Sequence, residues 1–122
     1  MSTLLLFNIP PHKRARIQVL AIQNALKVKA VPPEQAGNTL LEILSGAPVR
    51  PVDKPFTEEM LVMVDLRESQ LDKVLTGLLR QNVPVSLKAV MTAANAGWTA
   101  QELYSELCRE RAAVAGRGKA HP

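Results

Sequence analysis

Two short runs without polar alternation constrain the fold of this chain more than any other feature of its sequence. They are Thr3–Phe7 and Met60–Val64, and each is five residues long. A run of this length suits a β-strand, and the lack of alternation indicates a strand that is buried on both faces. We therefore expect both runs to be central strands of one β-sheet.

A helix and an edge strand are predicted to follow the first run. Residues 12–27 have helical periodicity, with Asn8 as a capping residue and Pro10 and Pro11 in the first turn. Lys27–Val31 then alternates polar and apolar residues, which is typical of an edge strand. The expected apolar stripe of the helix is Ala15, Val19, Ile22 and Leu26, with Leu20 at its border.

The second run is followed by the same order of elements. Asp65 and Glu68 stand at the spacing of an N-cap and its N3 partner, and the helical pattern continues to about Gln81. A strand is expected from Ser86 to Met91, with Lys88 pointing outward. The expected stripe of this helix is Leu71, Val74, Leu75, Leu78 and Leu79.

Each half is predicted to end with a capped helix. Thr39 and Glu42 have the spacing of a capping box, and so do Thr99 and Glu102. The first helix should be short and stop at Gly46, whereas the second should continue to about residue 115. Residues 29–31 and 88–90 also share the sequence Lys-Ala-Val, which suggests a chain built as two related halves.

We expect one α/β domain over residues 1–122. Its halves would be residues 3–45 and 60–115, with a partly ordered, proline-rich linker at 46–59 and a disordered tail at 116–122. Two βαβ units, each followed by an extra helix, can interlock into a ferredoxin-like sheet of order 4-1-3-2. The alternative is a four-stranded parallel doubly wound sheet of order 2-1-3-4. The internal repeat favours the ferredoxin-like sheet, and both topologies put the lysine-bearing strands at the edges.

Composition limits the compartments and partners of the chain. The formal net charge of +4 permits an anionic partner without requiring one. The single cysteine, Cys108, excludes an intramolecular disulfide. No stretch resembles a signal peptide, and no apolar run approaches the roughly 20 residues that a transmembrane helix needs. We therefore expect a cytoplasmic protein that does not enter a membrane.

Several motifs resemble a small bacterial family of unknown function. They are an opening Leu-Leu-Phe-Asn strand at residues 5–8, Pro55–Met63 (PFTEEMLVM), and Leu87–Thr92 (LKAVMT) followed by Asn95, Trp98 and Thr99. The resemblance covers nearly the whole chain and is strongest between residues 56 and 107. It implies no activity, cofactor or catalytic residue.

No catalytic, metal-binding or cofactor-binding motif is recognisable in the sequence. His12 and His121, the two histidines, lack a carboxylate or cysteine at ligand spacing. Cys108 has Arg109 and Arg111 nearby, and we interpret it as a small, partly buried thiol. We therefore expect a protein that is not an enzyme, with no metal and no cofactor.

The turn before the last helix is the candidate ligand-binding site. A strand end and a helix N-terminus meet there, and the N–H groups of Ala100 and Gln101 could hold a small anion. The competing interpretation is structural, with the turn bonded to itself and Trp98 packed on Leu103 as a hydrophobic staple. The candidate residues are Thr92, Asn95, Trp98 and Thr99.

A basic patch occupies the start of the first predicted helix. Its residues are His12, Lys13, Arg14 and Arg16. A helix N-terminus disfavours positive charge, which an acidic partner or a nucleic-acid backbone would compensate. The competing interpretation is a solvated surface, and no aromatic residue is interleaved with these bases to stack on single strands.

Three hypotheses on function follow, in order of preference. The first is a small non-enzymatic α/β module that acts through protein contacts, either by self-association or with a regulatory partner. The second is a small-molecule or anion sensor that uses the turn Thr92–Thr99. The third is weak nucleic-acid binding through residues His12–Arg16.

Overall fold

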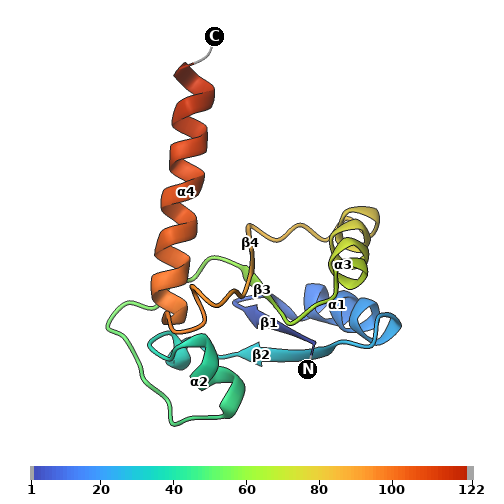
Figure 1. The fold of residues 1–122 in the computed structure, drawn as a ribbon, viewed down its shortest axis with the longest axis horizontal. Helices are drawn as coiled ribbons and strands as arrows, with labels where there is room; N and C mark the ends of the chain where they lie inside the picture. The colour runs from blue at the N-terminus through green and yellow to red at the C-terminus, as the bar shows by residue number, and fades with distance from the viewer. Residues whose placement is uncertain (1, 121–122) are drawn as a thin grey trace.

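The computed structural model describes residues 2–120, and their side chains through residue 115. These residues form a mixed α+β fold, an open four-stranded sheet with four α-helices (Figure 1). The strands are β1 (Thr3–Phe7), β2 (Lys27–Val31), β3 (Met60–Val64) and β4 (Leu87–Val90). The helices are α1 (Pro11–Gln23), α2 (Leu40–Ser45), α3 (Glu68–Arg80) and α4 (Ala100–Ala120), with a short 3₁₀ helix, η1 (Pro33–Gln35), before α2.

The sheet has the strand order β2-β1-β3-β4, so the two unbroken runs are its central strands, as expected. β1 is parallel to β2 and β3 is parallel to β4, while β1 and β3 are antiparallel, with Leu5 opposite Val62. The α/β class is confirmed, and the strand order is that of the doubly wound alternative, 2-1-3-4, but neither predicted topology is right as a whole. Each βαβ unit keeps its two strands adjacent, which excludes the interlocked ferredoxin-like order 4-1-3-2. The antiparallel central pair excludes the all-parallel doubly wound sheet.

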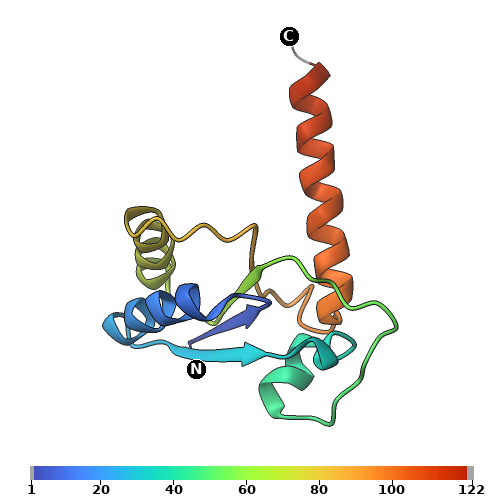
Figure 2. The ribbon, with the colours of Figure 1, turned by 180° about the vertical axis from the view of Figure 1, so that it is seen from behind.

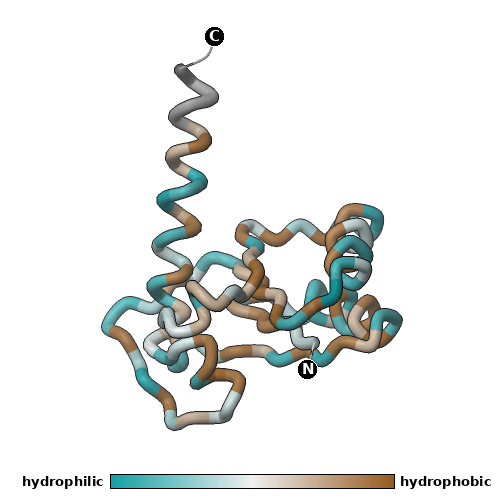
Figure 3. Tube along the Cα trace, in the orientation of Figure 1, coloured by the Kyte–Doolittle hydropathy of each residue, from teal (hydrophilic) through white to brown (hydrophobic). Residues whose placement is uncertain are grey.

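Both faces of the sheet are covered, which explains why the central strands lack alternation. Leu4, Leu6 and Met63 pack beneath α1 and α3 on one face, and Figures 1 and 2 show these two helices side by side. Leu5 and Val62 pack on the other face beneath α2 and the first turns of α4. Figure 3 shows apolar residues gathered along the central strands. The lysine-bearing strands β2 and β4 are edges, as predicted.

The apolar stripe predicted for α1 is wrong over the length of the helix. Ala15 is exposed, and Val19 and Ile22 are 51% and 69% exposed. The residues that face the sheet are Ile17, Leu20 and Ala21, of which only Leu20 was expected, at the border of the stripe. These residues also have helical spacing, so the sequence offers two apolar faces, and packing against α3 buries the second one. Only Leu26 of the predicted stripe is buried, beyond the end of α1.

The predicted caps of α1 and α3 are also wrong. Asn8 and Asp65 adopt left-handed backbone conformations, with φ of 57° and 58°, and the helices begin later, at Pro11 and Glu68. Asn and Asp tolerate this conformation better than most residues, and here it turns the chain out of the sheet. The stripe of α3 is correct except for Leu79, which is 83% exposed.

The linker and the last helix differ in how well the sequence predicts them. Residues 46–59 form no helix or strand, yet Phe56 is buried among aromatic side chains, so the linker is ordered there. Helix α4 continues past its expected end at residue 115 to Ala120, which removes residues 116–120 from the predicted disordered tail. Residues 121 and 122 of that tail lie outside the described part of the chain.

The two halves share local features at corresponding positions. Asn8 and Asp65 have left-handed backbone conformations, and Ala25 and Asn82 also have positive φ. The two residues of each pair are the same number of residues apart in the sequence. Both halves have the order strand, helix, strand, helix. These correspondences support the internal repeat, which stays a prediction.

Candidate functional site

Thr39 and Thr99 lie opposite each other and begin the last helix of each half. They form an isolated antiparallel β-bridge. Thr39 Oγ1 accepts from the Glu42 N–H at 3.1 Å, and Glu42 Oε1 accepts from the Thr39 N–H at 3.0 Å. Thr99 and Glu102 make the same two bonds at 3.0 and 2.9 Å. Both predicted capping boxes are therefore present.

The first turns of α2 and α4 also satisfy each other's backbone donors. The Leu40 N–H donates to the Trp98 carbonyl at 3.1 Å, and the Ala100 N–H donates to the Asn38 carbonyl at 2.9 Å. A helix begins with N–H groups that lack partners within the helix, so this exchange replaces water at two buried helix ends. It joins the two halves through their backbones.

A second pair of bonds extends the exchange by one residue. The Leu41 N–H donates to the Ala96 carbonyl at 3.3 Å, and the Gln101 N–H donates to the Ala36 carbonyl at 2.9 Å. The N–H groups of Ala100 and Gln101, which the sequence suggested for anion binding, thus have protein acceptors in this structure.

The turn from Thr92 to Asn95 is bonded to itself. The Thr92 N–H donates to Asn95 Oδ1 at 2.8 Å, and the Asn95 N–H donates to Thr92 Oγ1 at 3.3 Å. Asn95 Nδ2 also donates to the Val90 carbonyl at 3.1 Å, at the end of β4. These bonds fix the shape of the turn, and they leave Thr92 at the edge of a cavity on the sheet.

Trp98 lies at the surface and is not part of either core. It is 36% exposed, whereas Leu103, its expected staple partner, is 2% exposed and packs in the core beneath α4. Trp98 instead borders a shallow groove of about 550 Å³ along the outer face of α4. The other residues of this groove are Gln101, Glu102, Ser105, Glu106 and Arg109. The structure thus places Trp98 and Thr92 in different hollows.

The basic patch is partly engaged in contacts within the protein. Lys13 Nζ bonds Glu59 Oε1 at 2.8 Å and the Pro84 carbonyl at 2.7 Å. Arg16 Nη1 donates to the Gln81 carbonyl at 2.9 Å. His12 and Arg14 are exposed. Half of the patch therefore connects α1 to the second half of the chain, which gives those two cations a structural role.

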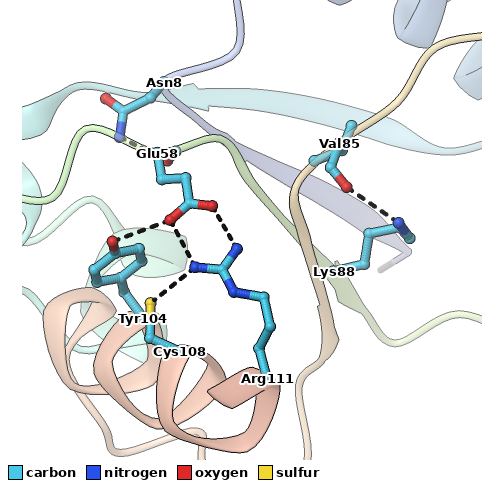
Figure 4. A network of polar contacts seen from close by, with 7 residues as sticks. All are labelled: Asn8, Glu58, Val85, Lys88, Tyr104, Cys108 and Arg111. Carbon is cyan, nitrogen blue, oxygen red and sulfur yellow. Dashed lines mark hydrogen bonds and ion pairs between the residues drawn. The ribbon is translucent and has the colours of Figure 1, made fainter. Parts of the chain in front are cut away.

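A network of polar side chains, shown in Figure 4, holds the first turns of α4 against the linker. Glu58 accepts from Arg111 Nη1 at 2.5 Å, from Arg111 Nη2 at 3.0 Å and from the Tyr104 hydroxyl at 3.2 Å. Arg111 Nη2 also lies 3.7 Å from Cys108 Sγ. The Tyr104 ring stacks on Phe56, with 4.6 Å between the ring centroids. The network therefore ties α4 to the segment before β3.

The charges of this network favour one protonation pattern. Hydrogen bonds from Arg111 lower the pKa of Glu58, although partial burial opposes them. The neighbouring Cys108 side chain, then burial, then Glu58 raise the pKa of Tyr104 to about 12. The hydrogen bond to Glu58 raises the pKa of Arg111 above its ordinary value. Glu58 is thus a carboxylate held between a guanidinium and a neutral phenol.

Sequence reasoning missed this network, although part of it has a sequence signal. Tyr104, Cys108 and Arg111 follow one another at spacings of four and three residues, which puts them on one face of a helix. Nothing local connects that face to Glu58, which lies in the linker. Cys108 is half-buried, in agreement with its interpretation as a packed thiol.

The second half of the chain matches a known family. Residues 59–114 match the model of a domain of unknown function, DUF3783. This confirms the resemblance to a family of unknown function over residues 59–114, whereas the opening Leu-Leu-Phe-Asn strand lies outside the match. No curated protein and no solved structure matches the chain.

The DUF3783 match spans β3, α3, β4 and the first part of α4. It includes Trp98 and the α4 residues of the network, whereas Glu58 lies just before it. The surfaces built by α4 therefore belong mostly to the matched domain. Within residues 2–120, no helix is both long enough and apolar enough to span a membrane.

Proposed function

We propose that the protein is a small non-enzymatic α/β module that acts through protein contacts, and that α4 pairs with α4 of a second copy. The observation that carries this proposal is the projection of α4 away from the sheet (Figure 1). Its first turns pack on the core through Leu103 and the Tyr104 network, but residues 109–115 are all exposed.

A projecting helix of this kind gains stability from a partner. Isolated helices shorter than about 12–15 residues are marginal in water, because few hydrogen bonds offset the cost of nucleation. Residues 112–115 are Ala-Ala-Val-Ala, and all four are exposed. A partner that covers this apolar segment would remove it from water.

The charges on the outer face of α4 favour an antiparallel second copy. Glu102 and Glu106 lie in the first half of this face, and Arg109 follows them. An antiparallel pair centred between residues 105 and 106 would put Arg109 of each copy beside Glu102 of the other. Arg109 also pairs with Glu106 of its own helix, so the contact between copies would extend this pair to the other copy's Glu102. The same register would put Ala113 on Trp98, so one geometry covers both the charged residues and the exposed aromatic ring.

Sedimentation velocity over a range of protein concentrations tests this proposal. We expect a reversible monomer–dimer equilibrium that Trp98→Ala and Arg109→Glu each shift toward monomer. Leu79→Glu is the matched control, since Leu79 is 83% exposed but lies on α3, on the other side of the sheet. A monomer at every concentration would overturn the proposal, and so would equal weakening by all three variants.

A further inference from the structure

A cavity of about 800 Å³ lies on the face of the sheet that α2 and α4 cover. It opens where β1 begins and β3 ends, at the paired residues Thr3 and Val64. Leu44 of α2 forms one wall, and the turn that starts with Thr92 forms another. Because α2 is short, it covers the other end of this face and leaves this one open.

Two lysines of β2 give the cavity a positive edge. Lys27 and Lys29 both line it, since alternate residues of a strand point to the same face. Lys29 Nζ donates to the Ile43 carbonyl at 2.6 Å, a neutral acceptor. In the part of the chain with described side chains, neither ammonium has a carboxylate within ion-pair distance. Asp65 also lines the cavity, so the described residues at its edge include two cations and one carboxylate.

A polar donor and apolar walls complete the cavity. The Thr92 hydroxyl oxygen accepts a hydrogen bond from the Asn95 N–H. The hydroxyl hydrogen can rotate toward an acceptor of a bound molecule and donate to it. Leu44, Val64 and Met91 supply apolar surface. A mostly apolar hollow with a few polar groups at its edge is the usual form of a small-molecule site.

The internal repeat indicates what fits in such a hollow. Val64 and Phe7 are equivalent in the repeat, because each comes directly before a left-handed residue, Asp65 or Asn8. Leu44 and Tyr104 are also equivalent, because each lies the same number of residues after the N-cap of its helix. Val64 and Leu44 line the cavity, whereas Phe7 and Tyr104 both contact the ring of Phe56.

The place that the internal repeat relates to the cavity is therefore filled by an aromatic ring from the linker. The ring centroid of Phe56 lies 5.7 Å from that of Phe7 and 4.6 Å from that of Tyr104.

We propose that the cavity binds a small organic anion with an apolar, ring-sized body, of the class of the aromatic carboxylates. Lys27 and Lys29 hold the carboxylate, Thr92 donates a further hydrogen bond, and Leu44, Val64 and Met91 enclose the ring. This site is separate from the outer face of α4 and does not depend on dimer formation.

Titration with phenylacetate, followed by amide chemical shifts and calorimetry, tests the proposal. We expect saturable shifts confined to residues around the cavity, weaker binding of the neutral analogue phenylethanol, and weaker binding of acetate, which lacks the ring. The double change Lys27→Gln, Lys29→Gln should weaken binding by about tenfold or more, because it removes both cations that hold the carboxylate. Lys88→Gln, on the other edge strand, is the control and should leave the affinity unchanged.

Ala96→Phe separates loss of the site from loss of the fold. This change puts a ring into the cavity from its wall, as Phe56 fills the corresponding place between Phe7 and Tyr104, so the variant should stay folded and lose phenylacetate binding. No saturable shift in the wild-type protein would overturn the proposal. Equal affinity for phenylacetate and phenylethanol, or binding that survives Ala96→Phe, would also overturn it.

Discussion

Single residues set the helix starts on which both halves depend. Thr39 and Thr99 each accept a bond from the backbone of their own helix, at 3.1 and 3.0 Å. Thr39→Ala and Thr99→Ala should each lower the free energy of unfolding by about 1 kcal/mol, the usual loss for an N-cap. Serine at either position keeps the hydroxyl and should restore most of it. Urea denaturation measures the difference, and an alanine variant as stable as wild type would contradict the prediction.

Glu42 should make part of this stability depend on pH. The hydrogen bond from the Thr39 backbone is the largest cause that lowers the pKa of Glu42 below its ordinary 4.5. A carboxyl whose folded pKa is depressed stabilises the fold above its unfolded pKa, and this contribution is lost as the pH falls through the folded value. Glu42→Gln should therefore destabilise the protein at neutral pH and progressively less below 4.5. An effect of the same size at every pH would contradict this.

Tyr104 offers a direct test of the network at the foot of α4. It is the only tyrosine, so the ultraviolet absorbance of phenolate reports on it alone. We expect its pKa near 12, raised chiefly by Cys108, and Cys108→Ala should lower it. Circular dichroism at each pH identifies the range in which the chain stays folded. Titration near the ordinary value of 10.0 in the folded protein would show that the network does not form.

At the scale of the elements, the turns before α2 and α4 have similar sequences but different surroundings. A Cβ on Gly37 would lie 2.2 Å from the Arg50 carbonyl oxygen, whereas one on Gly97 would meet nothing within 4 Å. Gly37→Ala should thus cost about 1–3 kcal/mol, because the linker must move away from the turn. Gly97→Ala should be neutral or stabilise by about 0.5 kcal/mol, through a less flexible unfolded chain. Thermal denaturation measures the stability of both variants. Equal changes in the two melting temperatures would contradict the prediction.

Local patterns predict most elements but not their orientation. The capping boxes, the stop at Gly46 and the ranges of β1, β2 and β3 all follow from short-range chemistry. Helix α1 does not, because both Ala15-Val19-Ile22 and Ile17-Leu20-Ala21 have helical spacing. Only the contact with α3, where Leu20 packs against Gly77, selects the buried face. The starts of α1 and α3 do not follow from local sequence either. Asn8 and Asp65 are residue types that N-caps and left-handed turns both favour, so the sequence does not distinguish the two.

At the scale of the whole molecule, the arrangement of the halves lies beyond local patterns. The exchange of backbone bonds around Thr39 and Thr99 joins segments about 60 residues apart in sequence, and it involves carbonyls that any residue supplies. The sheet order therefore has no residue-specific signal. The contact between Glu58 and Arg111 also lacks a local sequence signal. The cavity lacks one too, because it depends on how short α2 is.

The projecting end of α4 separates stability from association. Chains that end at Arg111 or at Ala115 both keep the contacts with Glu58, so both should unfold within about 0.5 kcal/mol of the full chain. The measurement belongs at concentrations at which the full chain is monomeric, because dimer formation adds stability by mass action. In the proposed register Ala113 contacts Trp98, so the chain ending at Arg111 should fail to dimerise while the chain ending at Ala115 still does.

A large loss of stability in either chain would mean that the end of α4 supports the fold itself. Dimerisation of the shorter chain would mean that another surface joins the copies.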